Sequence, residues 1–282
     1  MTIRTRFAPS PNGPLHLGHA YAAVVAHDLA RARGGAFMLR IEDIDAARSR
    51  AELVPEILGD VSWLGLSWDG PAVFQSARLD SYAAAAERLT GMGLLYPCTC
   101  TRAQVAAAAS GIGPDGPLYP GTCRSRRDAP PGAAWRIDMA RAAALAGPLW
   151  WEDELAGRQL ARPELFGDAV LVRGDAPASY HLAATLDDAA EGITLVTRGF
   201  DLFAASHIHR LLQALLDLPV PVWHHHALVV EMDGRKLAKR RGSPALADLR
   251  CADEDGAALA IALRAGRFPT GLSLGSGVEA GA

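Results

Sequence analysis

The chain has 282 residues, a formal net charge of -3 and a hydrophobic fraction of 50%. This length suffices for one large domain, or for one domain with a sizeable insertion, around a buried core. The sequence has no run of the roughly 18 apolar residues that a membrane-spanning helix needs, and its N-terminal segment lacks the apolar centre of a secretory signal. We therefore expect a cytoplasmic protein with no membrane partner. The net charge neither favours nor excludes a nucleic-acid partner.

Residues 1–96 begin with a strand, a helix and a second strand. TIRTRFAP predicts a short strand that runs into a proline-rich turn. The helix that follows has apolar residues at helical spacing and ends at Gly34-Gly35. AFMLRIED then predicts a buried strand that ends in charged residues. This order is typical of an α/β, Rossmann-like nucleotide-binding fold, in which ligands bind beyond the carboxyl ends of the strands.

The rest of the chain divides into three further segments. Residues 97–167 are rich in proline and glycine and contain three cysteines, which suggests an insertion between two halves of the nucleotide fold. The α/β pattern resumes in residues 168–265 as the second half of the catalytic domain. Residues 266–282 are rich in glycine and serine and favour a disordered tail. We expect the protein to be a monomer.

The segment PSPNGPLHLGH places His16 and His19 on either side of Gly18 at the start of the first helix. Glycine lets a ring or ribose approach the backbone, the helix N-terminus attracts phosphate, and imidazoles can stabilise charge developing on an α-phosphate. Downstream, Lys236 and Lys239 in GRKLAKRRGS could neutralise departing pyrophosphate. Taken separately, the histidines could instead bind a metal or lie on the surface, and the lysines could form a solvated basic loop.

Together, HLGH and KLAKR resemble the two signature motifs of class I aminoacyl-tRNA synthetases, usually HIGH and KMSKS. RFAPSPNGPLHLGHA, LRIEDID, SYHLA, LVTRGFDL and KLAKRRGSPAL resemble the glutamyl branch of that class, in the same order, over nearly all of residues 4–250. The resemblance implies adenylate formation from ATP with Mg²⁺. It assigns catalysis to His16, His19, Lys236 and Lys239, and ATP binding to these residues with Pro9 and Gly18. Ala238 replaces the serine of the signature, so we expect weaker ATP binding but not inactivity.

The glutamyl resemblance implies L-glutamate as the amino-acid substrate, with two carboxylates and one ammonium group. Arg6 and Arg198 are the implied carboxylate-binding residues, because a guanidinium offers a bidentate fork. Glu42 is the counter-charge for the ammonium group, and Tyr180 matches a position that contacts the amino acid. The implied glutamate-binding set is Arg6, Ala8, Ser10, Glu42, Tyr180 and Arg198. Alternatively, Glu42 forms a surface pair with Arg40, and Tyr180 belongs to the core.

Three of the four cysteines, Cys98, Cys100 and Cys123, are clustered, which in a reducing compartment suggests a metal site more than disulfides. With Tyr119 they could complete a tetrahedral, structural zinc site. The alternative is that Zn²⁺ takes the three thiolates and a water molecule. Cys251 lies outside this pattern and is expected to be a buried thiol.

The pattern C-x-C…Y-x-x-x-C resembles the glutamyl-queuosine tRNA(Asp) synthetases, truncated relatives of glutamyl-tRNA synthetase. Only about thirty residues follow ALADL, so we expect no anticodon-binding domain. The resemblance implies activation of glutamate without tRNA and its transfer to the queuosine base in the anticodon stem-loop of tRNA(Asp). Phosphate-contact candidates are Arg124, Arg126, Arg127, Arg240 and Arg241. Surface solvation explains these arginines equally well.

Three other functions remain open from the sequence. The chain could charge a tRNA 3′ end as an ordinary glutamyl-tRNA synthetase, or it could be a non-catalytic paralogue that binds RNA or an amino acid. It could also be a nucleotidyltransferase of the same fold that uses another acid. The triple histidine at residues 224–226 is expected to open a strand and to be structural, not metal-binding.

Overall fold

The computed structural model describes residues 2–231, 233–235, 237 and 245–275. The lysine-motif residues Lys236, Ala238, Lys239, Arg240 and Arg241 lie outside the described residues.

The N-terminal part contains a parallel sheet of β1 (Arg4–Phe7), β2 (Ala36–Ile41) and β3 (Val73–Phe74). Helix α1 (Leu17–Arg31) connects β1 to β2 and packs its small apolar residues against them. The predicted strand–helix–strand start is therefore confirmed. In this arrangement the histidine loop and the end of β2 lie at the same edge of the sheet.

A second sheet continues the first at β1. It has the order β11 (Leu195–Gly199), β12 (Val222–His226), β8 (Trp150–Asp153) and β9 (Gly157–Leu160), with β11 and β12 parallel. The backbone N–H of Thr194 donates to the carbonyl of Arg4 at 3.0 Å. This bond sets the start of β11 beside β1, so the ends of these strands face one region.

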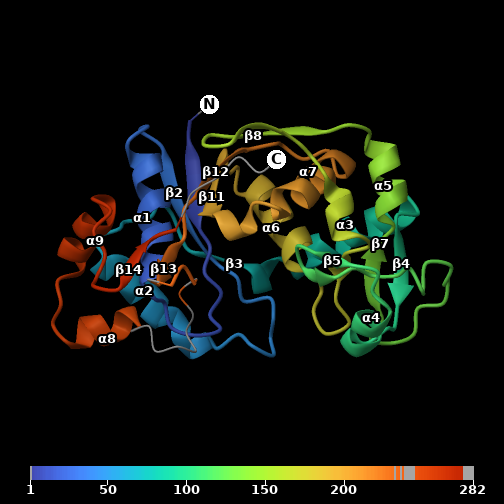
Figure 1. Cartoon of the computed structure of the whole chain (residues 1–282), viewed down its shortest axis with the longest axis horizontal. Helices are drawn as coiled ribbons and strands as arrows, with labels where there is room; N and C mark the ends of the chain where they lie inside the picture. Colours follow the sequence, from blue (N-terminus) through green and yellow to red (C-terminus); the bar gives the residue numbers. More distant parts are fainter. Residues whose placement is uncertain (1, 232, 236, 238–244, 276–282) are drawn as a thin grey trace.

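Helices surround these sheets and form two hydrophobic cores that lie side by side along the long axis (Figure 1). The core at the N-terminal end includes α1, α2, α8 and α9, and the other includes α3, α5, α6 and α7. Their bounds are α2 (Val54–Trp63), α3 (Leu79–Gly91), α5 (Met139–Ala146), α6 (Tyr180–Ala190), α7 (Ala205–Leu215), α8 (Leu246–Cys251) and α9 (Gly256–Arg264).

The cysteine-rich segment contributes to a third, antiparallel sheet. Its order is β10 (Val170–Val172), β7 (Ala134–Ile137) and β4 (Leu95–Cys98). Between β4 and β7 the chain forms α4 (Arg102–Ala108) and the hairpin of β5 (Ile112–Gly113) and β6 (Gly116–Pro117). Thr101 caps α4 by accepting from the backbone N–H of Gln104, so the helix begins directly after the two-cysteine segment.

The end of the described chain is more ordered than its composition suggests. Strand β12 ends at His226, and β13 (Val229–Glu231) follows it as a separate strand. Strand β13 pairs with β14 (Leu272–Leu274), so disorder from residue 266 onward is the wrong expectation for this part of the tail. The pairing is between segments far apart in sequence, which local composition does not reveal. Among the described residues, none of the helices combines the length and apolarity needed to cross a bilayer.

Candidate functional site

The two histidines of the first motif cap the start of α1. The Nδ1 atom of His16 accepts from the backbone N–H of Gly18, and Nδ1 of His19 accepts from the backbone N–H of His16, each at 3.1 Å. Their ring centroids lie 3.8 Å apart. A Cβ on Gly18 would come within 3.0 Å of the His16 ring. Glycine here allows the His16 ring to fold back onto the helix start.

These histidines line a cavity of about 200 Å³. Gly199, Asp201 and His226, at the ends of β11 and β12, add to its wall. A Cβ on Gly199 would lie 2.5 Å from the Leu228 side chain and 2.6 Å from the Asp201 side chain, so a larger residue here would displace these two side chains. None of these three residues was predicted as a site residue, although LVTRGFDL, which contains the first two, supported the family resemblance.

The loop after β1 carries Ala8, Pro9 and Ser10 and is tied to the end of β2. The Pro9 carbonyl accepts from the backbone N–H of Glu42 at 3.0 Å. Pro9 is buried, whereas Ala8 and Ser10 are half-buried. The bond therefore places the predicted amino-acid loop next to the predicted ammonium-binding carboxylate, while Pro9 has a structural contact instead of a place in the histidine-lined cavity.

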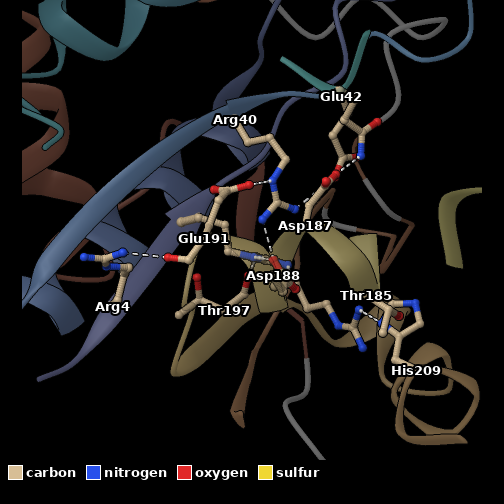
Figure 2. A network of polar contacts seen from close by, with 12 residues as sticks. Arg4, Arg40, Glu42, Thr185, Asp187, Asp188, Glu191, Thr197 and His209 are labelled. Carbon is tan, nitrogen blue, oxygen red and sulfur yellow. Dashed lines mark hydrogen bonds and ion pairs between the residues drawn. The ribbon is translucent and has the colours of Figure 1, made fainter. Parts of the chain in front are cut away.

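A buried network of arginines and carboxylates lies behind this loop (Figure 2). Arg6 of β1 donates through Nε and Nη2 to the two carboxylate oxygens of Asp188, at 2.8 and 3.2 Å, and through Nη1 to the Thr197 carbonyl. Arg40 of β2 donates to Asp188 and to Glu191, each at 2.6 Å. The network thus joins β1, β2, β11 and α6. The two donors of Arg6 that could grip a carboxylate are already bound to Asp188. Arg6 can therefore act on a substrate through its positive charge more than through a bidentate hydrogen bond.

Glu42 and Arg40 do not form the alternative surface pair. Arg40 is fully buried, and its Nη1 atom lies 3.9 Å from Glu42 while its other donors contact Asp188 and Glu191. Burial raises the pKa of Glu42 to about 7, although Arg40 and Arg6 oppose the shift. A bound ammonium group would favour the ionised carboxylate and lower this pKa. Glu42 therefore has the position and chemistry expected for an ammonium ligand.

Arg198 on β11 is buried among uncharged partners. Its donors contact the Tyr180 hydroxyl at 3.3 Å, the Ser206 hydroxyl at 2.6 Å, His225 at 3.1 Å and His209 at 3.3 Å. Within the described part of the chain it forms no ion pair with a carboxylate. Tyr180, at the start of α6, is half-buried, and its hydroxyl interacts electrostatically with Arg198, Glu42 and Arg6. These side chains therefore come together, and Tyr180 is not simply a core residue.

The clustered cysteines meet at the end of β4. The Sγ atoms of Cys98, Cys100 and Cys123 all lie within 4.8 Å of one another, and those of Cys100 and Cys123 are 3.6 Å apart. The Tyr119 hydroxyl lies 3.3 Å from Cys98 Sγ and 3.5 Å from Cys100 Sγ. Sulfur ligands of one tetrahedral Zn²⁺ are about 3.8 Å apart. The cluster can therefore hold a metal ion, and its donor set fits zinc.

A larger cavity, of about 820 Å³, lies between this cluster and the start of α6. Cys100 and Tyr119 contribute to its wall, as do Tyr180 and His181. Its charged lining residues are Arg102, Arg136, Arg173, Asp115 and Asp175. The cavity therefore connects the cysteine cluster with the tyrosine that contacts Arg198, and it has room for more than an amino acid.

The arginines proposed to contact phosphate have mixed surroundings. Arg124 forms an ion pair with Asp168 at 2.7 Å, whereas Arg126 and Arg127 contact Thr99 and backbone carbonyls. All three line a separate cavity of about 320 Å³ together with Arg141. They form a local basic surface, and Arg124 is partly neutralised within it.

Two further expectations need correction. Cys251 is exposed at the end of α8 and is not a buried thiol. The triple histidine closes β12 instead of opening a strand, because β12 runs from Val222 to His226. His225 contacts Arg198 and His226 lines the smaller cavity, so both lie beside candidate site residues.

Comparison with known proteins agrees with this geometry. The family profile described as "tRNA synthetases class I (E and Q), catalytic domain" matches residues 2–268. A protein of Rhodobacter capsulatus named "Glutamyl-Q tRNA(Asp) synthetase" is 50% identical over 261 residues, which cover 87% of this chain and 94% of that protein. One of the same name from Geobacter sulfurreducens is 40% identical over 91% of this chain and 82% of its own.

Among solved structures, the glutamate-tRNA synthetase of Elizabethkingia anophelis is similar with a TM-score of 0.70 and 26% identity. The similarity covers 87% of this chain but 55% of that synthetase. The chain therefore spans about half the length of this structural relative.

We predict that the buried network is a main source of stability. Asp188→Asn should lower the free energy of unfolding by about 3–5 kcal/mol, because Arg6 and Arg40 lose a shared carboxylate. Although burial opposes it, pairing with these arginines lowers the pKa of Asp188 to about 2. Its contribution is thus present above its unfolded-state pKa, near 4, and is lost as the pH falls toward 2.

Urea unfolding at several pH values measures this difference. The exposed pair of Glu152 and Arg158 provides the control, because Glu152→Gln should change the free energy of unfolding by less than about 1 kcal/mol. Equal stability of Asp188→Asn and the control would contradict the prediction.

Proposed function

Because the chain belongs to the glutamyl-Q tRNA(Asp) synthetases, within the class I tRNA synthetases, we propose that it joins L-glutamate to the queuosine base of tRNA(Asp). The protein is a ligase of the aminoacyl-tRNA synthetase type, and the α/β catalytic domain predicted from the sequence is confirmed. The observation that carries the proposed substrate is Arg198, a buried cation whose hydrogen-bond partners among the described residues are all uncharged. A substrate carboxylate would supply its missing counter-charge.

In the proposed complex, glutamate lies with Arg198 and Tyr180 on one side and the carboxylate of Glu42 on the other. Arg198 and the Tyr180 hydroxyl would hold a substrate carboxylate, and Glu42 would hold the ammonium group. Arg6 adds positive charge from behind, and Ala8 and Ser10 line the site. The selectivity for glutamate over glutamine follows from Arg198, because a neutral amide would leave the buried guanidinium without a counter-charge.

Activation would proceed by attack of the glutamate α-carboxylate on the α-phosphorus of ATP. The new P–O bond gives glutamyl-adenylate, and the bond to pyrophosphate breaks. With Nδ1 of His16 and His19 accepting backbone hydrogen bonds, the neutral rings carry their protons on Nε2. We assign these N–H groups to the phosphate oxygens as charge develops. Mg²⁺ would enter with ATP as part of the substrate.

Lys236 and Lys239 are assigned to pyrophosphate from the sequence motif alone. Their neighbours in the described chain support this assignment. Leu237 lines the histidine cavity, and Ala245 pairs with His16 through a backbone bridge. One residue inside the lysine motif and one shortly after it therefore lie close to the proposed triphosphate site.

The larger cavity is the proposed entrance for the acceptor base. It reaches Tyr180 from the side of the cysteine cluster, and its lining includes Arg102 and Arg136, which suit an RNA anticodon loop, whereas Arg173 is paired with Asp45 and Asp175. A hydroxyl of queuosine would attack the glutamyl carbonyl and release AMP. The proposed segment 97–167 thus provides one side of the acceptor site, and its basic residues Arg124, Arg126 and Arg127 are candidates for contacts to the RNA backbone.

One Zn²⁺ held by Cys98, Cys100, Cys123 and Tyr119 is the proposed structural metal of this segment. Such a closed site supplies folding stability and no reacting water. The Cys123 thiol ionises more readily than an ordinary cysteine thiol. Burial would raise its pKa, but hydrogen bonds from Tyr119 and the neighbouring backbone lower it to about 7.

The first prediction separates catalysis from folding at His19. His19→Asn keeps an acceptor near the position of Nδ1 but removes the Nε2–H donor. We expect glutamate-dependent ATP–pyrophosphate exchange, measured without tRNA, to fall roughly 100-fold or more while helix α1 remains capped. His27→Asn, on the same helix but outside the cavity, is the matched control. Exchange within a few-fold of the wild type in His19→Asn would remove His19 from the chemical step.

The second prediction concerns the metal. The purified protein should contain about one zinc per chain, and Cys100→Ser should lose it and destabilise the cysteine segment. Cys251→Ser should retain zinc, because this exposed thiol lies outside the cluster. Metal analysis and thermal unfolding measure both effects. Full stability of a zinc-free wild-type protein would overturn the assignment.

The third prediction concerns the acceptor. Labelled glutamate should pass to tRNA(Asp) that carries queuosine, and not to tRNA(Asp) from cells unable to make queuosine. Both RNAs keep an intact 3′ end, so the comparison isolates the base. Equal labelling of the two tRNAs, or charging of tRNA(Glu), would instead indicate an ordinary synthetase.

A further inference from the structure

The partners of Arg198 form two hydrogen-bonded chains with fixed direction. An arginine only donates hydrogen bonds, so the imidazole nitrogens that face it must present lone pairs. Arg198 Nε donates to Nε2 of His225, which leaves the proton of that ring on Nδ1. This Nδ1 lies 2.7 Å from the buried carboxylate of Asp153. The first chain therefore runs from Arg198 through His225 to Asp153.

The second chain follows the same logic on the other side of the guanidinium. Arg198 Nη1 faces Nδ1 of His209 at 3.3 Å, so His209 carries its proton on Nε2. That nitrogen lies 3.2 Å from Nδ1 of His181, whose Nε2 lies 2.8 Å from Asp115. Each ring donates away from Arg198 and accepts toward it, and the chain ends at a carboxylate on the β5–β6 turn.

The surroundings keep both rings that face Arg198 in their uncharged form. Burial lowers the pKa of His225 to about 4 despite its bond to Asp153, and burial with the nearby Arg198 lowers the pKa of His209 well below its usual range. The two carboxylates are therefore one or two rings away from the guanidinium. They can fix the direction of the hydrogen bonds without pairing directly with Arg198.

We propose that His209 and His225 are positioning residues for glutamate, which hold Arg198 by imidazole lone pairs so that its charge is left for the substrate carboxylate. Arg6 shows the contrasting arrangement in the same site, because its guanidinium is paired directly with Asp188. The inference rests on the proposed function, since it takes glutamate as the substrate. It adds two histidines and the ends of their chains, Asp153 and Asp115, to the amino-acid site.

The test uses two neighbouring histidines of α7. His209→Leu removes an acceptor of Arg198. His207→Leu is the matched control, because His207 is equally buried but accepts from Trp151 instead. We expect His209→Leu to raise the KM for glutamate in ATP–pyrophosphate exchange roughly 10- to 100-fold, the range for loss of a hydrogen bond to a charged group. The KM for ATP should change little, and His207→Leu should leave both KM values near those of the wild type.

Conservative variants of the same histidines provide the second part of the test. His209→Asn and His225→Gln each keep an acceptor near the nitrogen that faces Arg198, so they should restore most of the glutamate affinity measured by titration calorimetry. Equal KM values for glutamate in His209→Leu and His207→Leu, or a parallel rise in both substrates' KM values, would overturn the positioning role. Absence of glutamate-dependent exchange in the wild type would instead overturn the proposed function.

Discussion

The site depends on one buried electrostatic constraint, the sharing of Asp188 by two arginines from adjacent strands. Arg6 comes from β1, Arg40 from β2 and Asp188 from α6, and Glu191 completes the pairing of Arg40. Residues separated by about 150 positions are thereby held together in the protein interior. Buried charges tolerate little displacement, because the loss of a partner leaves an unpaired buried ion and lowers the stability of the fold. The network therefore fixes the strand ends from which Glu42 and the amino-acid loop project.

Two arginines of the site show how surroundings decide what a charged side chain can do. Arg6 has its bidentate donors bound to Asp188, and its main effect is to stabilise the junction of β1 and α6. Arg198 has hydroxyls and imidazoles as partners, which satisfy its donors without cancelling its charge. The sequence motifs assigned both to the same task. Only the three-dimensional partners distinguish an arginine that supports the site from one suited to a ligand.

Much of the fold and part of the site could be predicted from the sequence because the signals were local. The β1–α1–β2 start follows from hydrophobic periodicity and a glycine stop, and the short spacing of Cys98 and Cys100 pointed to the metal cluster. Long-range partners could not be predicted in this way. Asp153 and Asp188 carry no local signal, β14 is a three-residue strand in a glycine-rich tail, and His225 was read with its neighbours as a structural run. These residues acquire their roles only through contacts across the fold.

The reciprocal cap at the start of α1 also explains why the two histidines are three positions apart. His19, three positions after the N-cap, accepts from the backbone N–H of His16, while the His16 ring accepts from that of Gly18, and the first turn of a helix allows both contacts. The interval is thus set by helical geometry before any nucleotide is considered. Inserting a single residue between them would uncap α1 and turn one ring away at the same time. The motif is consequently inseparable from the folding of its helix, and neither histidine can change its place in the chain alone.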